Sequence, residues 1–287
     1  MRFTTYLRHG QARLAVVDGD AAIDLADTVP GTPADLRAAL AAGTDLASAA
    51  AQAITSAAPR LPLATLAFAP LVPEPGKTIC LGLNYFDHAK EGGRTERPDY
   101  PWFFYRGKSS LLGHGQPGLV PKVSTKFDYE AELAVVIAKT VPRHVHQADA
   151  LAYVFGYTCF NDMSVRDYQK RTPQWTIGKN FDATGGFGPV LVSADELAPG
   201  ATGLRIQSRL NGQLMQDAST SDMIFSVAET IALLAECMTL EAGDTLVMGT
   251  PAGVGQARTP PLWMKAGDVV EIEIERIGVL RNPIVAE

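Results

Sequence analysis

The sequence predicts an α+β fold that is mostly β-structure, with few helices and a small N-terminal domain. Short alternating segments bounded by Gly, Asn and Asp recur through most of the chain, as is typical of strands joined by tight turns. Only a few stretches space their apolar residues as a helix does. Strands and helices do not alternate in a βαβ rhythm, so a Rossmann-type sheet is disfavoured.

The beginning of the chain predicts the small domain. Three short strands are expected within the first 30 residues, and an Ala-rich helical region follows over residues 33–57, interrupted near Gly43. Five prolines between residues 59 and 77 indicate an extended connector. We place the domain boundary there, with residues 1–70 in the first domain and residues 71–287 in the second.

The larger domain carries clear local signals. Residues 204–216 predict a hairpin with Asn211-Gly212 in its turn. Residues 226–238 predict a helix that begins with a capping box of Ser226 and Glu229. Two later strands each follow an Ala-Gly-Asp turn, which indicates a roll or barrel rather than an array of repeats.

Composition narrows the class of protein. The 287 residues have a net charge of −6 and no run of Lys or Arg, which disfavours a nucleic-acid or anionic-membrane partner. The N-terminal residues lack the apolar core of a signal peptide, and no stretch approaches the roughly 20 apolar residues of a membrane span. The three cysteines are far apart and in no metal-ligand spacing. We therefore expect a reduced, cytoplasmic protein.

Three acidic residues share one face of a predicted strand over residues 127–137. Asp128, Glu130 and Glu132 alternate there with apolar residues on the other face. Residues two apart on a strand lie about 6 to 7 Å from each other, and at an effective dielectric near 20 two like charges then repel by roughly 2.5 kcal/mol. Either this face is solvated, or a cation removes the repulsion.

A fourth acid follows another apolar strand. That strand runs into Asp162, and from there Arg166 and Gln169 follow at helical spacing, so the three are expected on one helix face. Asp162 either caps that helix or joins Glu130 and Glu132 in an all-oxygen site. Hard oxygen ligands favour Mg²⁺, Mn²⁺ or Ca²⁺ over zinc.

His88 and Glu91 suggest a general base. They are three apart on a short helical turn that is expected to begin near Asn84, so their side chains can meet. A carboxylate bound to one imidazole nitrogen fixes the tautomer and raises the basicity of the other nitrogen. The alternative is an ordinary surface pair.

Two glycine-rich segments complete the candidate site. The turn after residues 245–248 carries Thr250, and its backbone N–H groups can hold a carboxylate or oxyanion. It lacks the Lys-Ser/Thr ending of a P-loop, which excludes a nucleotide interpretation. Lys179 stands beside the second glycine-rich loop. The alternatives are a plain connecting loop and a solvated lysine.

Taken in order, these segments resemble the fumarylacetoacetate hydrolase family. The matching stretches are GLNYFDHAKE, DYEAELAVVI, FNDMSVRDYQ, IGKNFD and TLVMGTPAGVG, supported by NGQLMQDASTSDMIF, and they cover residues 80–285 nearly throughout. The resemblance implies a mixed β-sandwich roll, usually dimeric, with a divalent cation in the catalytic domain. The first 70 residues look like the small N-terminal domain that many members carry.

Roles follow from the resemblance by motif position. It implies that Glu130, Glu132 and Asp162 hold Mg²⁺ or Mn²⁺, with Ca²⁺ possible. It also implies that the His88–Glu91 pair activates water and that Lys179 stabilises the developing oxyanion. The implied substrate-binding residues are Arg166, Gln169, Thr250, Tyr85 and Arg106. Arg106-Gly107 stands where many members have Lys-Pro, and residues 182–189 are richer in glycine than usual, so the substrate preference is not carried over.

The implied activity is hydrolysis of a carbon–carbon bond in a 2,4-dioxo acid of the acylpyruvate, fumarylpyruvate or diketo-deoxy sugar acid type, as in aromatic or sugar acid catabolism. The products would be pyruvate, or a related 2-oxo acid, and a second acid. An oxaloacetate-type decarboxylase and a 2-oxo-dienoic diacid isomerase are alternatives at the same site, although the presence of both His88 and Glu91 favours hydrolysis. A non-catalytic metal-binding protein is the alternative from another class. The expected partners are a small anionic 2-oxo acid and a second copy of the chain, as a homodimer.

Overall fold

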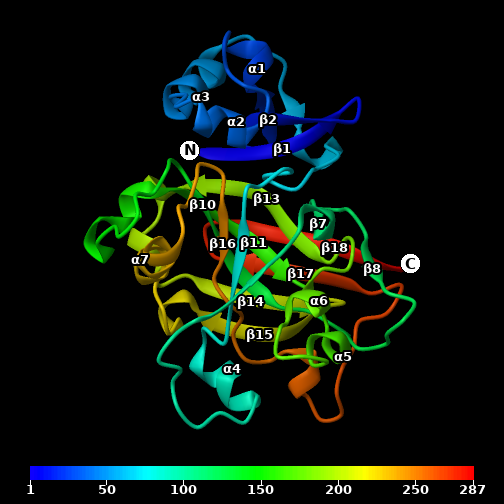
Figure 1. Ribbon diagram of the computed structural model, residues 1–287. Helices are drawn as coiled ribbons and strands as arrows, with labels where there is room; N and C mark the ends of the chain where they lie inside the picture. Colours follow the sequence, from blue (N-terminus) through cyan, green and yellow to red (C-terminus); the bar gives the residue numbers. More distant parts are fainter.

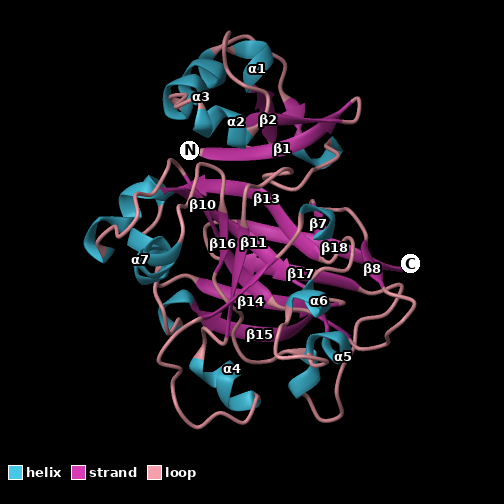
Figure 2. Ribbon diagram, in the orientation of Figure 1, coloured by secondary structure: helices cyan, strands magenta, loops and turns pink.

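Two open β-sheets dominate the computed structural model, which describes residues 1–287 (Figures 1 and 2). The larger sheet has 11 strands in the order β4-β3-β2-β1-β13-β11-β10-β16-β5-β6, with β7 beside β13. Its strands are β1 (Arg2–Arg8), β2 (Gln11–Asp18), β3 (Ala21–Asp24), β4 (Leu61–Pro62), β5 (Thr78–Gly82), β6 (Trp102–Tyr105), β7 (Leu111–Leu112), β10 (Ala131–Ile137), β11 (Val154–Asp162), β13 (Gly185–Ser193) and β16 (Thr245–Val247).

The smaller sheet has five strands in the order β15-β14-β17-β18-β8 and packs against the larger one. Its strands are β8 (Gly118–Val120), β14 (Arg205–Leu210), β15 (Gln213–Ser219), β17 (Val269–Ile274) and β18 (Gly278–Ala286). A separate pair joins β9 (Phe127–Asp128) to β12 (Ser164–Val165). The predicted α+β class and mixed β-sandwich roll are confirmed, and because neither sheet closes on itself the fold is not a barrel.

Helices are few and short. They are α1 (Leu25–Thr28), α2 (Leu36–Ala41), α3 (Leu46–Thr55), α4 (Phe86–Glu91), α5 (Arg166–Gln169), α6 (Thr176–Lys179) and α7 (Val227–Cys237). Single 3₁₀ segments lie at Leu63–Thr65, Lys108–Ser110, Gln147–Tyr153, Ala194–Glu196, Pro199–Ala201, Thr220–Asp222 and Gly255–Ala257. None of the helices has the length and apolarity needed to cross a membrane.

The N-terminal segment continues the larger sheet. Strand β1 pairs with β13 in antiparallel register, with Thr4 opposite Val190. Helices α1, α2 and α3 lie together above these strands, at the blue end of the chain in Figure 1. The predicted break in the helical region is confirmed, since α2 ends before Gly43, whose φ of 67° suits glycine. The division at residue 70 stays a prediction.

Strand β10 lies at the centre of the molecule and is covered on both faces. Leu133, Val135 and Ile137 belong to the core shared with the smaller sheet. Ala134 and Val136 belong to a second core shared with the N-terminal helices. A strand covered on both sides reads as a nearly continuous apolar run, which is the pattern that follows Glu132 in the sequence.

The local predictions in the larger domain are mostly confirmed. The hairpin β14–β15 turns through Asn211 and Gly212, which have φ values of 52° and 78° as a tight two-residue turn requires. Ser226 caps α7 by accepting a hydrogen bond from the Glu229 N–H at 3.2 Å. The Glu229 side chain does not return a bond to the Ser226 N–H, so the expected capping box is only half formed.

Candidate active site

The register of β10 against β11 assembles the acidic cluster. Ala131 lies opposite Asn161, and the Asp162 N–H donates to the Glu130 carbonyl at 3.0 Å. This pairing brings together Glu130, just before β10, Glu132, near the start of β10, and Asp162, at the end of β11. One carboxylate oxygen from each of the three lies within 4.8 Å of the others. We call these three residues the carboxylate triad.

The triad is buried. Glu130 is 4% exposed, Glu132 is 1% exposed and Asp162 is fully covered. The interpretation of this strand face as a solvated surface is therefore wrong, because β10 is a central strand. Asp162 does not cap a helix either. It ends β11, and α5 begins only at Arg166, without a side-chain cap.

Cations surround two members of the triad. Lys179 Nζ lies 2.6 Å from Glu130 Oε2 and 2.5 Å from Asp162 Oδ2. Arg166 Nη1 lies 2.6 Å from Glu130 Oε1, and Arg106 Nε pairs with Asp162 Oδ1. Burial by itself raises the pKa of Glu130, but Arg166 and Lys179 outweigh it and hold that pKa below its ordinary value. Glu130 is therefore ionised.

Glu132 is the uncompensated member of the triad. Its Oε2 accepts a hydrogen bond from the Gly249 N–H at 2.6 Å, and no cationic side chain forms an ion pair with it. Burial, Asp162 and Glu130 all raise the pKa of Glu132. A divalent cation would remove this electrostatic cost, and three carboxylates form the donor set that Mg²⁺ and Mn²⁺ prefer. The residues present therefore fit a divalent metal.

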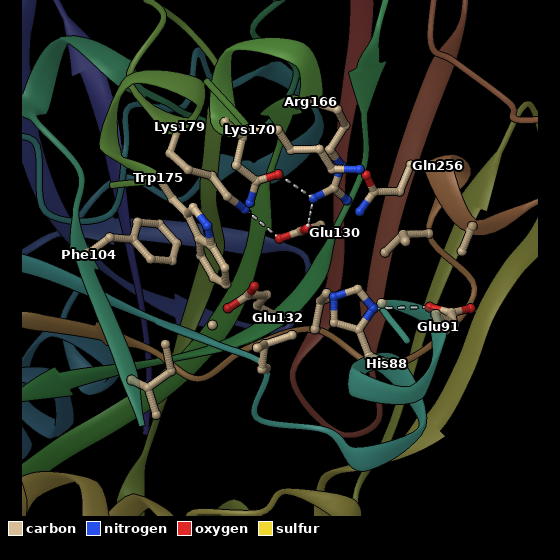
Figure 3. A pocket seen from close by; sticks show the side chains of 18 of the residues that line it. His88, Glu91, Phe104, Glu130, Glu132, Arg166, Lys170, Trp175, Lys179 and Gln256 are labelled. Carbon is tan, nitrogen blue, oxygen red and sulfur yellow. Dashed lines mark hydrogen bonds and ion pairs between the residues drawn. The ribbon is translucent and has the colours of Figure 1, made fainter. Parts of the chain in front are cut away.

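A cavity of about 330 Å³ opens beside the triad (Figure 3). The predicted site residues on its wall are His88, Glu91, Glu130, Glu132, Arg166, Gln169, Lys179 and Thr250. They come from α4, the segment between β9 and β10, β10 itself, α5, α6 and the loop that follows β16. Figure 3 shows the His88 ring between Glu91 on one side and Glu132 on the other.

The expected contact between His88 and Glu91 is confirmed, on a helix that begins at Phe86 rather than near Asn84. His88 Nδ1 lies 3.0 Å from Glu91 Oε2, and Glu91 Oε1 accepts a hydrogen bond from the Gly253 N–H at 2.8 Å. Both side chains are largely covered, with 11% and 24% exposed. The pair is therefore held from two sides and is not an ordinary surface pair.

The glycine-rich loop after β16 binds carboxylates of this chain. Its N–H groups donate to Glu132 from Gly249, to Glu91 from Gly253 and to Asp128 from Gly255. The expectation that this loop holds an anion is met by three protein side chains, which it fixes in place. Loop and side chains are far apart in sequence, so the sequence could not reveal these partners.

Asp128 has a positioning role that the sequence did not separate from the triad. Its Oδ2 accepts from Arg166 Nε at 2.8 Å and from the Gln256 N–H at 3.0 Å. Arg166 Nη1 also lies 3.1 Å from Gln169 Oε1. Asp128 therefore anchors one wall of the cavity.

Two predicted substrate-binding residues lie behind the wall. Arg106 is 3% exposed and bonds to Asp162, to Thr184 and, at 2.6 Å, to the Met163 carbonyl. Tyr85 is 2% exposed, and its hydroxyl has no hydrogen-bond partner. Neither residue lines the cavity, so the expectation that they face a substrate is not met. In this structure the Arg106 guanidinium supports Asp162.

Several wall residues were not predicted from the sequence: Phe104, Arg94, Lys170, Trp175 and Gln256. Trp175 stacks on Trp102 with ring centroids 5.3 Å apart, and the Arg94 guanidinium lies 4.9 Å from the Trp102 ring. Gly82 allows this packing, since a Cβ there would lie 2.0 Å from Trp175 Cζ3. Gly82, the last residue of the apolar strand β5, was the one local signal in the sequence that another side chain packs closely against the backbone there.

The chain is similar in sequence to a known family and to two named enzymes. A family model described as fumarylacetoacetate (FAA) hydrolase C-terminal matches residues 77–285. The oxaloacetate tautomerase YisK of Bacillus subtilis is 45% identical over 218 residues, which cover 74% of this chain and 71% of that protein. The mitochondrial oxaloacetate tautomerase Fahd2a of Rattus norvegicus is 38% identical over 268 residues, covering 93% of this chain and 85% of that one.

A solved structure is similar over the whole chain. It is the maleylpyruvate hydrolase from Sphingobium sp. SYK-6 in complex with manganese(II) and pyruvate, with a TM-score of 0.82 and 30% identity. The alignment covers 100% of this chain and 99% of that one. These similar proteins carry the names of two kinds of enzyme, hydrolase and tautomerase.

Proposed function

The chain belongs to the fumarylacetoacetate hydrolase family, and we propose that it is a divalent-metal-dependent enzyme that interconverts the keto and enol forms of a small 2-oxo diacid of the oxaloacetate type. The observation that carries this proposal is the His88–Glu91 pair, which lines the same cavity as Glu130 and Glu132 of the carboxylate triad. The names of the Bacillus subtilis and Rattus norvegicus relatives support the choice of reaction.

The triad of Glu130, Glu132 and Asp162 would hold Mg²⁺ or Mn²⁺. When bound, such a cation supplies Lewis-acid polarisation of a carbonyl oxygen. The similar Sphingobium structure contains manganese(II), which supports a metal at this fold's site.

Cations on the wall would bind the carboxylates of the diacid. Arg166 lines the cavity, and its ion pairs with Asp128 and Glu130 hold its guanidinium in place there. Lys170 and Arg94 also line the cavity and form no ion pair with a protein carboxylate, so their charges are available to a second carboxylate. A cavity of about 330 Å³ suits a ligand of this size.

His88 would move the proton. Hydrogen bonding of Nδ1–H to Glu91 Oε2 leaves Nε2 as the basic nitrogen. Nε2 takes a proton from the carbon next to the ketone, and the electron pair of that C–H bond moves to the carbonyl oxygen. Return of a proton to that oxygen completes the enol, and the reverse sequence regenerates the ketone. Glu91 is a positioning residue that keeps the imidazole in the required tautomer.

The test follows the ultraviolet absorbance of enol oxaloacetate as it converts to ketone, in Mn²⁺, Mg²⁺ and EDTA. We expect acceleration that depends on metal and falls about 10²- to 10⁴-fold in His88→Ala, the range typical of general acid–base residues. Glu236→Gln, a change of an exposed side chain on α7, is the matched control. An unaccelerated conversion in every condition would refute the proposal.

Carbon–carbon hydrolysis of a 2,4-dioxo acid is the second candidate. The same His88–Glu91 geometry can deprotonate water, and the similar Sphingobium structure is named a maleylpyruvate hydrolase. Release of pyruvate from an acylpyruvate panel would identify the hydrolase, and CO₂ from oxaloacetate would identify a decarboxylase. A metal-binding protein without catalysis predicts that Glu91→Gln changes no measurable property.

The assembly and location that the sequence suggested are also proposals. We propose a homodimer, and sedimentation of a single 30.6 kDa species would refute it. We propose a cytoplasmic location, which fractionation of the cells of origin would test. The rat relative is named mitochondrial, so an organelle fraction belongs in that experiment.

A further inference from the structure

Lys179 bridges two members of the carboxylate triad. Its Nζ lies 2.6 Å from Glu130 Oε2 and 2.5 Å from Asp162 Oδ2, and the residue is only 2% exposed. Within the triad, Arg166 pairs with Glu130 alone and Arg106 pairs with Asp162 alone. Lys179 is therefore the one cation that joins two carboxylates of the triad, and Figure 3 shows its ammonium beside Glu130.

The packing of α6 fixes where the Lys179 side chain begins. Lys179 is the last residue of α6, and the preceding Gly178 packs so closely against α5 that a Cβ would lie 2.4 Å from Gln169 Cα. The Lys179 ammonium also lies 5.2 Å from the centre of the Phe104 ring, which lines the same cavity. The lysine is therefore a built part of the site and not a mobile surface charge.

The oxygens that Lys179 contacts are oxygens that a metal would need. Both oxygens of Glu130 already pair with a cation, Oε1 with Arg166 and Oε2 with Lys179. The same holds for Asp162, whose Oδ1 pairs with Arg106 and whose Oδ2 pairs with Lys179. A divalent cation held by these two carboxylates must therefore share oxygens with protein cations, and Lys179 is the one common to both.

The lysine opposes such a metal electrostatically. An ammonium between two carboxylates keeps its proton, so a divalent cation bound to the same carboxylates meets a like charge at close range. The lysine also neutralises part of the negative charge that attracts the metal. Glu132 has no cationic partner, so it is the triad member that attracts a metal without this opposition.

We infer that Lys179 sets the metal affinity of the triad: its ammonium stabilises the metal-free site by supplying positive charge between Glu130 and Asp162, and it weakens metal binding there. This inference rests on the proposed function in one respect, that the triad binds a divalent cation. It gives Lys179 a role toward the metal that is separate from any contact with a substrate.

The test measures the dissociation constant of Mn²⁺ by calorimetry for the wild type, Lys179→Met and Lys179→Gln, with no 2-oxo acid present. Met removes the charge at nearly the same side-chain length. Gln also removes the charge, but its amide can donate to Glu130 and Asp162, which favours folding if Lys179→Met does not fold. Lys108→Met is the matched control, because the Lys108 side chain is 64% exposed and pairs with Glu74. Thermal unfolding in EDTA shows which variants are folded.

We expect the dissociation constant of Mn²⁺ to fall by about 10- to 100-fold in each folded Lys179 variant, because a like charge near the metal is removed, and to stay unchanged in Lys108→Met. Each Lys179 variant should also unfold at a lower temperature than the wild type in EDTA and gain more from Mn²⁺. If Lys179 only positions the carboxylates, its variants bind Mn²⁺ with equal or lower affinity, and that result overturns the inference. If neither the wild type nor any variant binds Mn²⁺, the metal dependence in the proposed function is overturned, and the inference with it.

Discussion

Replacing Glu132 with Gln should stabilise the metal-free protein. Glu132 lies within 4.8 Å of both other carboxylates of the triad and has no cationic partner. Two like charges at that separation repel by about 3.5 kcal/mol at an effective dielectric of 20. Lys179 offsets part of this repulsion through Glu130 and Asp162. We therefore expect the free energy of unfolding to rise by about 1 to 3 kcal/mol, with Tm rising by about 2 to 4 °C per kcal/mol.

The side chain of Gln preserves the rest of the site. It has nearly the volume of Glu, and its carbonyl oxygen can still accept from the Gly249 N–H, now 2.6 Å from Glu132 Oε2. The sign of the pH dependence is also fixed. Burial, Asp162 and Glu130 raise the folded pKa of Glu132 above its unfolded value of about 4.3, so the metal-free wild type loses stability as pH rises above that value. The difference in unfolding free energy between Glu132→Gln and the metal-free wild type should therefore grow from pH 5 to pH 8.

Bound metal should make the wild type more stable than Glu132→Gln, the reverse of the order expected without metal. A cation at 100 times its dissociation constant stabilises the folded state by about 2.7 kcal/mol, and the variant lacks one of the three ligands. The assay is urea unfolding of the wild type, Glu132→Gln and the exposed control Glu236→Gln, in EDTA and in Mn²⁺. A variant less stable than the wild type in EDTA, or an equal gain from Mn²⁺ in both proteins, would refute the reasoning.

Three further predictions concern other parts of the structure. Gly82→Ala should lower the free energy of unfolding in urea by about 1 to 3 kcal/mol, because its Cβ would lie 2.0 Å from Trp175 Cζ3. An unchanged urea midpoint would show that the Trp175 ring moves freely. Asp128→Asn should destabilise the protein by about 3 kcal/mol, because it leaves Arg166 with one fewer buried anionic partner. It should also weaken the binding of malonate, a dicarboxylate, and an unchanged dissociation constant in calorimetry would contradict this role of Asp128. Burial, with a smaller effect of Arg281, lowers the pKa of His114 below its ordinary 6.5, so the stability present above pH 6.5 should fall as pH drops below it. His114→Gln should flatten that pH dependence of the unfolding free energy, and an identical profile would count against it.

Features that depend on a few neighbouring residues could be predicted from the sequence. The Asn211-Gly212 turn is such a feature, because its φ values are set by the residues in it. The contact of His88 with Glu91 is another, because a three-residue separation on a helix brings the side chains together. The α+β class also follows from local patterns, repeated along the chain.

The assignment of each acid to a partner required the tertiary structure. Asp128, Glu130 and Glu132 look equivalent in the sequence, yet Asp128 holds Arg166 while the other two join Asp162. The alternation of a strand cannot say whether its polar face meets water or another layer of the protein.

The partners of the glycine-rich loop after β16 could not be predicted from the sequence either. Its N–H groups were expected to serve a ligand, but they bind three side chains of this chain, including Glu132 at a separation of 117 residues. The sequence by itself determined which groups carry charge and which short segments turn or coil. Only the packing of the two sheets decided which charges are buried, because burial and pairing depend on contacts between residues that are distant along the chain.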